Sequence, residues 1–177
     1  MNTKRMLGVV GLCLILSCFS VPAAMAQHLV VKDAAHDTID PGLDFTSVNF
    51  SNRDRAIVVN FSFVRDRRGE VIFPVVVRGR GAVALVVSQH PRSGDNHLIF
   101  QTRHNDHATC KGLRSVWDRA EAELTIRVPS RCMRPGNYGA IKSWALTEGY
   151  HSASSDVDYA PQTKDGHLRL TGWIPRG

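Results

Sequence analysis

The stretch IVVNFSF, residues 57–63, decides the fold class, because large apolar side chains alternate along it with smaller or polar ones. Ile57, Val59, Phe61 and Phe63 would all project from one face of an extended chain. A helix would instead repeat its apolar positions every three or four residues. The stretch therefore predicts a half-buried β-strand.

The sequence on either side continues this pattern. Residues 51–54 read SNRD, which is turn chemistry, and an apolar run at 43–50 precedes them, so the two runs predict an antiparallel hairpin. Clusters of Gly, Pro and Asn separate the later runs, and Pro74 is expected at a sheet edge or a bulge. The further predicted strands are 29–32, 71–77, 82–88, 97–102, 124–128, 138–146 and 168–173.

The spacing of these runs predicts an all-β protein. About nine short strands follow one another without an amphipathic helix between them, which favours two packed antiparallel sheets over alternating strands and helices. Only residues 116–122 could form a helical turn, where Trp117 is expected to anchor the core, and 149–163 reads as a long surface loop. We therefore predict a two-sheet antiparallel β-sandwich of the jelly-roll or immunoglobulin-like kind.

The first 26 residues predict export. Lys4 and Arg5 precede an apolar run from residue 6 to residue 21, and Ala24-Met25-Ala26 is the small-x-small pattern of a cleavage site before Gln27. The run is shorter than the roughly 20 residues of a membrane-spanning helix. We expect a cleaved signal peptide, 1–26, and a secreted or envelope-associated domain, 27–177. Lipidation at Cys18, giving an anchored lipoprotein, is the alternative.

The mature chain is large enough for one core and is mildly basic. Its 151 residues can bury roughly 70% of their unfolded surface, and removal of Lys4 and Arg5 lowers the formal net charge from +6 to +4. Seven arginines fall between Arg53 and Arg80, which fits either an anion-binding patch or a solvated sheet face. No motif for nucleic-acid recognition accompanies them, so nucleic acid is not an expected partner.

Two cysteines remain after the signal, Cys110 and Cys132. In an oxidising compartment a disulfide between them is the expected state, and it should stabilise the fold by roughly 3 kcal/mol. Neither cysteine belongs to a CxxC pair, which disfavours a metal site or a catalytic thiol. The sequence thus predicts one structural disulfide.

Four aspartates lie close together near the start of the mature chain: Asp33, Asp37, Asp40 and Asp44. Carboxylates gathered at a turn suit a hard cation such as calcium, and Asp156 and Asp158 could join them from a distant loop. The spacing is not that of an EF-hand. Solvated acidic turns are the alternative.

Histidines offer a second candidate site. His104 and His107, with His90 and His97 upstream, could bind zinc or copper, or could work with a distant carboxylate in a small hydrolase. Neither a G-x-S-x-G elbow nor an H-E-x-x-H helix occurs. A loop that responds to protonation fits the same histidines.

Aromatic residues could form a contact surface for sugars. The available residues are Trp117, Trp144, Trp173, Tyr138, Tyr150 and Tyr159, although aromatic side chains more often fill cores. Tyr150 and Tyr159 fall in the polar segment and are the better candidates.

Several short motifs lie along the mature chain. It has D-x-x-x-D at 33–37, an aspartate-led strand at 44–48 and an apolar strand at 56–63 with a basic turn after it. It also has C-x-G-L at 110–113 and P-x-x-C at 129–132. In this layout the chain resembles a group of small secreted proteins common in actinobacteria. The layout is more loosely similar to the β-sandwich modules grouped with DOMON and family-9 carbohydrate-binding domains, some of which bind calcium, sugars or haem.

The resemblance implies a sandwich fold, a Cys110–Cys132 bridge and calcium at Asp33 and Asp37. It does not extend to haem, because the chain lacks a convincing Met/His ligand arrangement. We expect a non-catalytic secreted protein that binds a glycan or another protein at or outside the cell envelope. A small metal-dependent hydrolase and a structural envelope protein are the alternatives.

Overall fold

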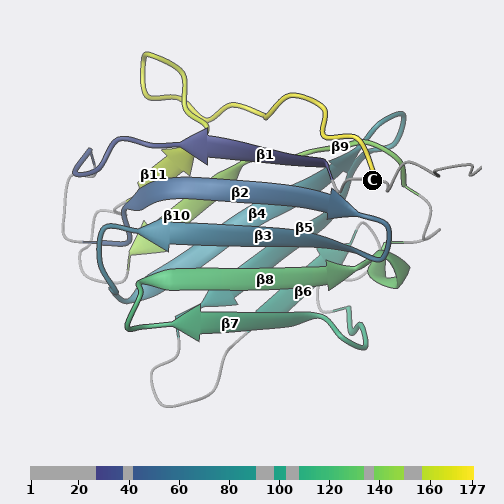
Figure 1. The fold of residues 1–177 in the computed structure, drawn as a ribbon, viewed down its shortest axis with the longest axis horizontal. Helices are drawn as coiled ribbons and strands as arrows, with labels where there is room; N and C mark the ends of the chain where they lie inside the picture. Colours follow the sequence, from purple (N-terminus) through teal and green to yellow (C-terminus); the bar gives the residue numbers. More distant parts are fainter. Residues whose placement is uncertain (1–26, 38–41, 91–97, 103–107, 134–137, 150–156) are drawn as a thin grey trace, which may run out of the picture.

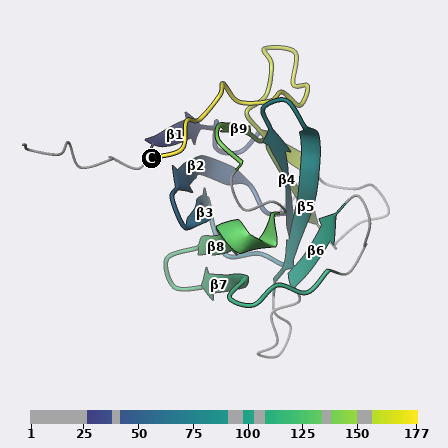
Figure 2. The ribbon, with the colours of Figure 1, turned by 90° about the vertical axis from the view of Figure 1, so that its right-hand side faces the viewer.

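Two antiparallel β-sheets pack face to face in the computed structural model (Figure 1 and Figure 2). It describes residues 27–37, 42–90, 98–102, 108–133, 138–149 and 157–177. The prediction of an all-β, two-sheet antiparallel sandwich is confirmed. The predicted signal, 1–26, and Cys18 lie outside the described residues. In the described ranges no helix is long and apolar enough to cross a membrane.

The first sheet has five strands in the order β1-β2-β3-β8-β7. Most neighbours are consecutive hairpins, and β8 adds to β3 with Ile57 opposite Val128. The order within the sheets was not predicted. The strands are β1 (Gln27–Lys32), β2 (Phe45–Arg53), β3 (Ala56–Phe63), β7 (Arg114–Asp118) and β8 (Glu123–Pro129).

The second sheet follows the order β11-β10-β4-β5-β6, and β9 pairs with β4 beside β10. A short 3-10 turn, η1 (Ser130–Cys132), is the helical element of the described residues. The strands are β4 (Gly69–Val77), β5 (Gly81–Gln89), β6 (Leu98–Thr102), β9 (Ile141–Lys142), β10 (Ala145–Gly149) and β11 (Val157–Ala160).

The core lies between the sheets and is built from the alternating side chains of the strands. Val59 and Phe61 of β3 are completely buried, as the sequence pattern predicts. The Phe61 ring lies 5.9 Å from that of Phe45 on β2 and 5.9 Å from that of Phe73 on β4. Phe61 therefore joins the two sheets.

The predicted strand at 138–146 is two strands, β9 and β10, and the break has a physical cause. β4 pairs with Lys142 through Val76 and with Leu146 through Ile72, so Pro74 falls midway between these pairs. Proline has no N–H to donate to a neighbouring strand. Instead the Ser143 hydroxyl donates to the Pro74 carbonyl oxygen at 2.6 Å. Pro74 thus lies on an interior strand, at an interruption in its pairing and one residue before a register shift.

The prediction of a strand at 168–173 is wrong. The backbone of this segment bonds to several separate partners, with Arg169 N–H donating to Pro161 and Thr171 N–H to Ser143. Leu168 and Leu170 are exposed. Alternating apolar residues therefore do not make a strand here, because no single neighbouring strand offers a continuous row of partners.

Two strands were missed. The segment at 116–122 contributes to β7 rather than to a helical turn, and β11 lies within the predicted loop at 149–163. Trp117 is half-buried and packs against the core, with its ring 5.7 Å from that of Phe63. The expectation for Trp117 as a core residue is confirmed.

The Cys110–Cys132 disulfide is present, with the two Cα atoms 5.5 Å apart. It joins the segment before β7 to η1, immediately after β8. The bridge therefore closes the β7–β8 hairpin at its open end.

Candidate functional site

Three aspartates from separate parts of the chain meet at one end of the sandwich. Asp33 follows β1, Asp37 lies in the next turn, and Asp158 belongs to β11. One carboxylate oxygen from each lies within 4.8 Å of the other two. In Figure 1 the arrowhead of β1 and strand β11 lie at the same end of the sandwich. The cluster therefore joins the end of one edge strand to the edge strand of the other sheet.

Hydrogen bonds with backbone groups fix the positions of Asp33 and Asp158. Asp33 N–H donates to the Thr46 carbonyl oxygen at 3.1 Å, which extends the pairing of β1 with β2. The buried Asp158 accepts from Phe45 N–H and from Tyr159 N–H, each at 2.7 Å. Asp158 therefore connects β11 of the second sheet to the start of β2 in the first.

The cluster carries no compensating positive side chain among the described residues. None of the three carboxylates forms a salt bridge with Lys, Arg or His there. The amide of Gln162 donates to Asp37 at 2.6 Å and to Asp33 at 3.3 Å. Asp33 Oδ2 is buried and accepts no hydrogen bond from the described residues.

Burial and mutual repulsion raise the pKa of two of these groups. Burial raises the pKa of Asp158 to about 8, against the Phe45 hydrogen bond and with the help of the charges on Asp33 and Asp37. Burial and the charge on Asp37 raise the pKa of Asp33 to about 6. Without a cation, the cluster therefore retains protons at pH values where an ordinary aspartate has lost them.

These residues fit a hard cation. Calcium takes oxygen ligands, and the cluster presents one carboxylate oxygen from each of three aspartates. The Oδ2 of Asp33 is buried and accepts no hydrogen bond from the described residues. A bound cation would favour the ionised carboxylates and displace the retained protons. Asp33, Asp37 and Asp158 are the residues that would hold it.

Of the other two predicted ligands, the structure describes Asp44, which is not one of the three clustered aspartates. Asp44 is buried, and its Oδ2 accepts from His36 N–H at 2.7 Å, so it shapes the turn that carries Asp37. Asp40 and Asp156 lie outside the described residues. Asp158, expected only as an addition from a distant loop, is the most buried member of the cluster.

His90 is the one predicted histidine ligand that the structure describes. Its Nε2 lies 2.6 Å from Asp66 Oδ1, and Arg119 Nε donates to the other Asp66 oxygen at 3.0 Å. Burial alone would raise the pKa of Asp66, but the hydrogen bonds from Arg119 and His90 hold it below its usual value. Trp117 packs edge-on against the His90 ring. His97, His104 and His107 lie outside the described residues.

The candidate aromatic surface is described only in part. Tyr159 is half-buried on β11, and Tyr150 lies outside the described residues. Trp173 is 38% exposed, and the Arg78 and Lys142 side chains lie 4.9 and 4.7 Å from its ring centre. Cations therefore occupy positions over the ring that a sugar would need.

The arginines between Arg53 and Arg80 do not form one patch. They separate into groups near the β2–β3, β3–β4 and β4–β5 connections, the first two of which lie at opposite ends of β3. Arg55, from the first group, instead lies near arginines from the later part of the chain.

No family model, curated protein or solved structure matches this chain. The likeness to secreted actinobacterial proteins and to DOMON and family-9 carbohydrate-binding modules therefore stays a prediction from short motifs.

Proposed function

We propose that this chain is a secreted, non-catalytic β-sandwich binding protein that takes up calcium at Asp33, Asp37 and Asp158. The observation that carries the calcium proposal is the convergence of three carboxylates, none of which forms a salt bridge with a described cationic side chain. Export is supported by the signal-like pattern at 1–26, and the Cys110–Cys132 disulfide is typical of exported proteins.

Calcium would act here by joining chain segments. The three ligands come from the end of β1, the following turn and β11, which belong to different sheets. A cation held by all three would favour the arrangement in which these edges meet. Its contribution is therefore expected to be to stability and to the shape of this end of the sandwich, with no chemical step.

A binding role fits the polar groups that a hydrolase would otherwise use. The buried His90 ring is directed to Asp66, and the Ser88 hydroxyl accepts from Trp117 Nε1 at 3.2 Å. Both side chains are buried, so neither is placed to meet a substrate from solution. We propose a glycan or a protein of the cell envelope as the partner class.

Thermal unfolding tests the calcium proposal. Protein stripped of metal on a chelating resin should gain about 5–10 °C in Tm at calcium concentrations near 100 times Kd, because a ligand of the folded state stabilises it by mass action. Magnesium should act more weakly, since it requires a smaller octahedral site.

Matched variants locate the effect. Asp37→Asn removes an exposed member of the cluster and should abolish most of the calcium response. Asp54→Asn removes a carboxylate in the β2–β3 turn, at the far end of β2, and should leave the response intact. A native protein that unfolds cooperatively at the same Tm with and without calcium would overturn the proposal.

A further inference from the structure

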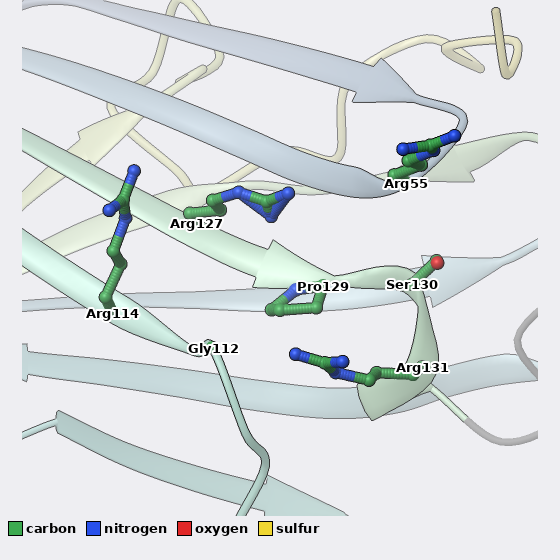
Figure 3. Close-up of a pocket in the computed structure, with 7 residues that line it drawn as sticks. All are labelled: Arg55, Gly112, Arg114, Arg127, Pro129, Ser130 and Arg131. Carbon is green, nitrogen blue, oxygen red and sulfur yellow. The ribbon is translucent and has the colours of Figure 1, made fainter.

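Four arginines line an open hollow on the outside of the five-stranded sheet. The hollow measures about 490 Å³, within the range of small-ligand sites. Figure 3 shows Arg127 and Arg131 on either side of Pro129 in this view, with Arg55 and Arg114 farther out. The lining residues are Arg55, Gly112, Arg114, Arg127, Pro129, Ser130 and Arg131.

Two of these arginines repel each other across neighbouring strands. Arg114 of β7 and Arg127 of β8 are directly opposite each other in the antiparallel register. Like charges at opposed positions of neighbouring strands destabilise a sheet. An anion between or above them would reverse the sign of this interaction.

No carboxylate lines the hollow, and none of its four arginines forms a salt bridge within the described part of the chain. The acidic residues of the same hairpin, Asp118 and Glu123, are opposed at its other end. Four strand positions separate the two pairs, about 13 Å. This exceeds the screening length of about 8 Å at physiological salt, so the acidic pair does little to neutralise the arginines.

The local backbone places Arg131 at the hollow. Its Nε and Nη2 donate to the Lys111 carbonyl oxygen at 2.8 and 2.5 Å. Gly112 has a φ of +85°, and a Cβ at this position would lie 2.8 Å from Arg131 Nη2. Glycine at 112 therefore provides both the turn and the space for the guanidinium group.

The disulfide holds together the two chain segments that carry Gly112 and Arg131. Cys110 and Cys132 flank Gly112 on one side and the Pro129–Arg131 segment on the other. Arg55 enters from the β2–β3 turn, where its carbonyl oxygen accepts from Ser130 N–H at 2.9 Å. The guanidinium groups thus project from a backbone that is held by a covalent bond and by hydrogen bonds.

We propose that this hollow, defined by Arg55, Arg114, Arg127 and Arg131, binds a soluble polyanion through its phosphate, sulfate or carboxylate groups. A guanidinium group donates two parallel hydrogen bonds to such a group, and several of them on one surface raise the local concentration of anions. The Ser130 hydroxyl adds a further hydrogen-bonding group. A polymer fits better than a single small anion, because the arginines are spread over the β2–β3 turn, β7, β8 and η1.

Isothermal titration with defined polymers tests the proposal. The protein, in calcium-free buffer with 150 mM NaCl as an approximately physiological salt, is titrated with inorganic polyphosphate, dextran sulfate and polygalacturonate, and with uncharged dextran as the control. At least one anionic polymer should bind and dextran should not. The polymer that binds most tightly identifies the oxyanion group. Absence of binding by all three would overturn the proposal.

Charge-matched variants separate a local site from the general positive charge of the protein. Arg55→Gln with Arg114→Gln changes two exposed side chains and should weaken binding about tenfold. Arg65→Gln with Arg68→Gln removes the same charge from exposed positions at the other end of β3 and should change binding less than about twofold.

Equal weakening in the two double variants would show that only the overall charge matters and would overturn the proposal. If the first double variant did not fold, the single variants Arg55→Gln and Arg114→Gln would be compared in the same way with Arg65→Gln and Arg68→Gln. Asp37→Asn should bind the polymer like the native protein, so that failure of the calcium proposal remains distinguishable from failure of this one.

Discussion

Asp33 is the residue whose substitution best separates the effect of calcium from that of the fold. Its Oδ2 is buried and accepts no hydrogen bond from a described N–H group, and one of its carboxylate oxygens lies within 4.8 Å of one of Asp158. Asp33→Asn places an amide N–H group there in one of its two orientations, and this group can donate to Asp158. We expect the calcium-free variant to gain about 1–2 kcal/mol, or about 3–6 °C in Tm, and to lose its response to calcium.

The comparison for this prediction is Asp37→Asn, measured in the same thermal scans. That substitution removes an exposed carboxylate that accepts from Gln162, so it should abolish the calcium response without a comparable gain in stability. A calcium-free Asp33→Asn protein that melts well below the native protein would contradict the assignment of an unsatisfied oxygen at this position.

The raised pKa values predict how stability changes with pH. Asp33 and Asp158 have pKa values of about 6 and about 8 in the folded protein, against 3.8 for an ordinary aspartate. The folded state therefore binds more protons than the unfolded state between these limits, and stability falls as pH rises. The pKa of Asp66 is lowered in the folded protein, so this residue has the opposite effect. Its contribution to stability is lost as the pH falls below the usual aspartate value and its carboxylate takes up a proton.

Urea unfolding at a series of pH values measures this. The calcium-free protein should lose stability from about pH 4 to about pH 8, and saturating calcium should remove most of the loss because it favours the ionised carboxylates. A calcium-free protein that became steadily more stable over this range would contradict the assignment.

At the scale of elements, Phe61 of β3 contributes to the packing of the two sheets through its contact with Phe73 of β4. Phe61 is completely buried and its ring contacts aromatic rings from both sheets. Phe61→Ala should destabilise the protein by about 3–5 kcal/mol, through lost burial and a cavity between the sheets. Chemical unfolding measures the change, and Val58→Ala, half-buried on the other face of β3, should cost much less.

Strands with a clear period of two could be predicted from the sequence, and β3, β4, β5 and β8 lie close to their predicted ranges. The segment at 138–146 has the same pattern, but its pairing is interrupted opposite Pro74, which lies 70 positions earlier than Trp144. The segment at 168–173 lacks a continuous partner. In both cases the missing information is the identity of the neighbouring strand.

Strands β7 and β11 were missed because their buried positions carry small or polar side chains, Ser115 in β7 and Asp158 and Ala160 in β11. β7 reads RSVWD and β11 reads VDYA, and each is an edge strand with few positions that require apolar side chains. Pairing with β8 and β10 supplies the strand structure that their composition does not indicate.

The two candidate sites also differ in how far they could be predicted from the sequence. Asp33 and Asp37 are neighbours in the sequence, so their proximity could be predicted, whereas Asp158 is placed beside them by the pairing of β10 with β11. The arginine hollow could not be predicted as a unit. Arg55 lies far in sequence from Arg114, Arg127 and Arg131, and only the β3–β8 pairing and the disulfide bring them together.

At the scale of the whole molecule, the disulfide links stability to the arginine hollow. Cys110 and Cys132 are 22 residues apart, and opening a loop of this length should cost about 3 kcal/mol. A variant with Cys110→Ser and Cys132→Ser should therefore melt about 6–12 °C lower. The native protein under reducing conditions is the second measurement, and a melt unchanged by both treatments would contradict a stabilising bridge.

The two ends of β2 lie beside sites of opposite charge, the aspartate cluster near Phe45 and the arginine hollow near Arg53. Nine strand residues separate them by about 30 Å. The molecule consequently has an electric dipole along the sandwich, which would turn it in the field of a negatively charged surface so that the β2–β3 turn approaches first. A divalent ion at the acidic end would reduce this dipole and weaken the preference for one orientation.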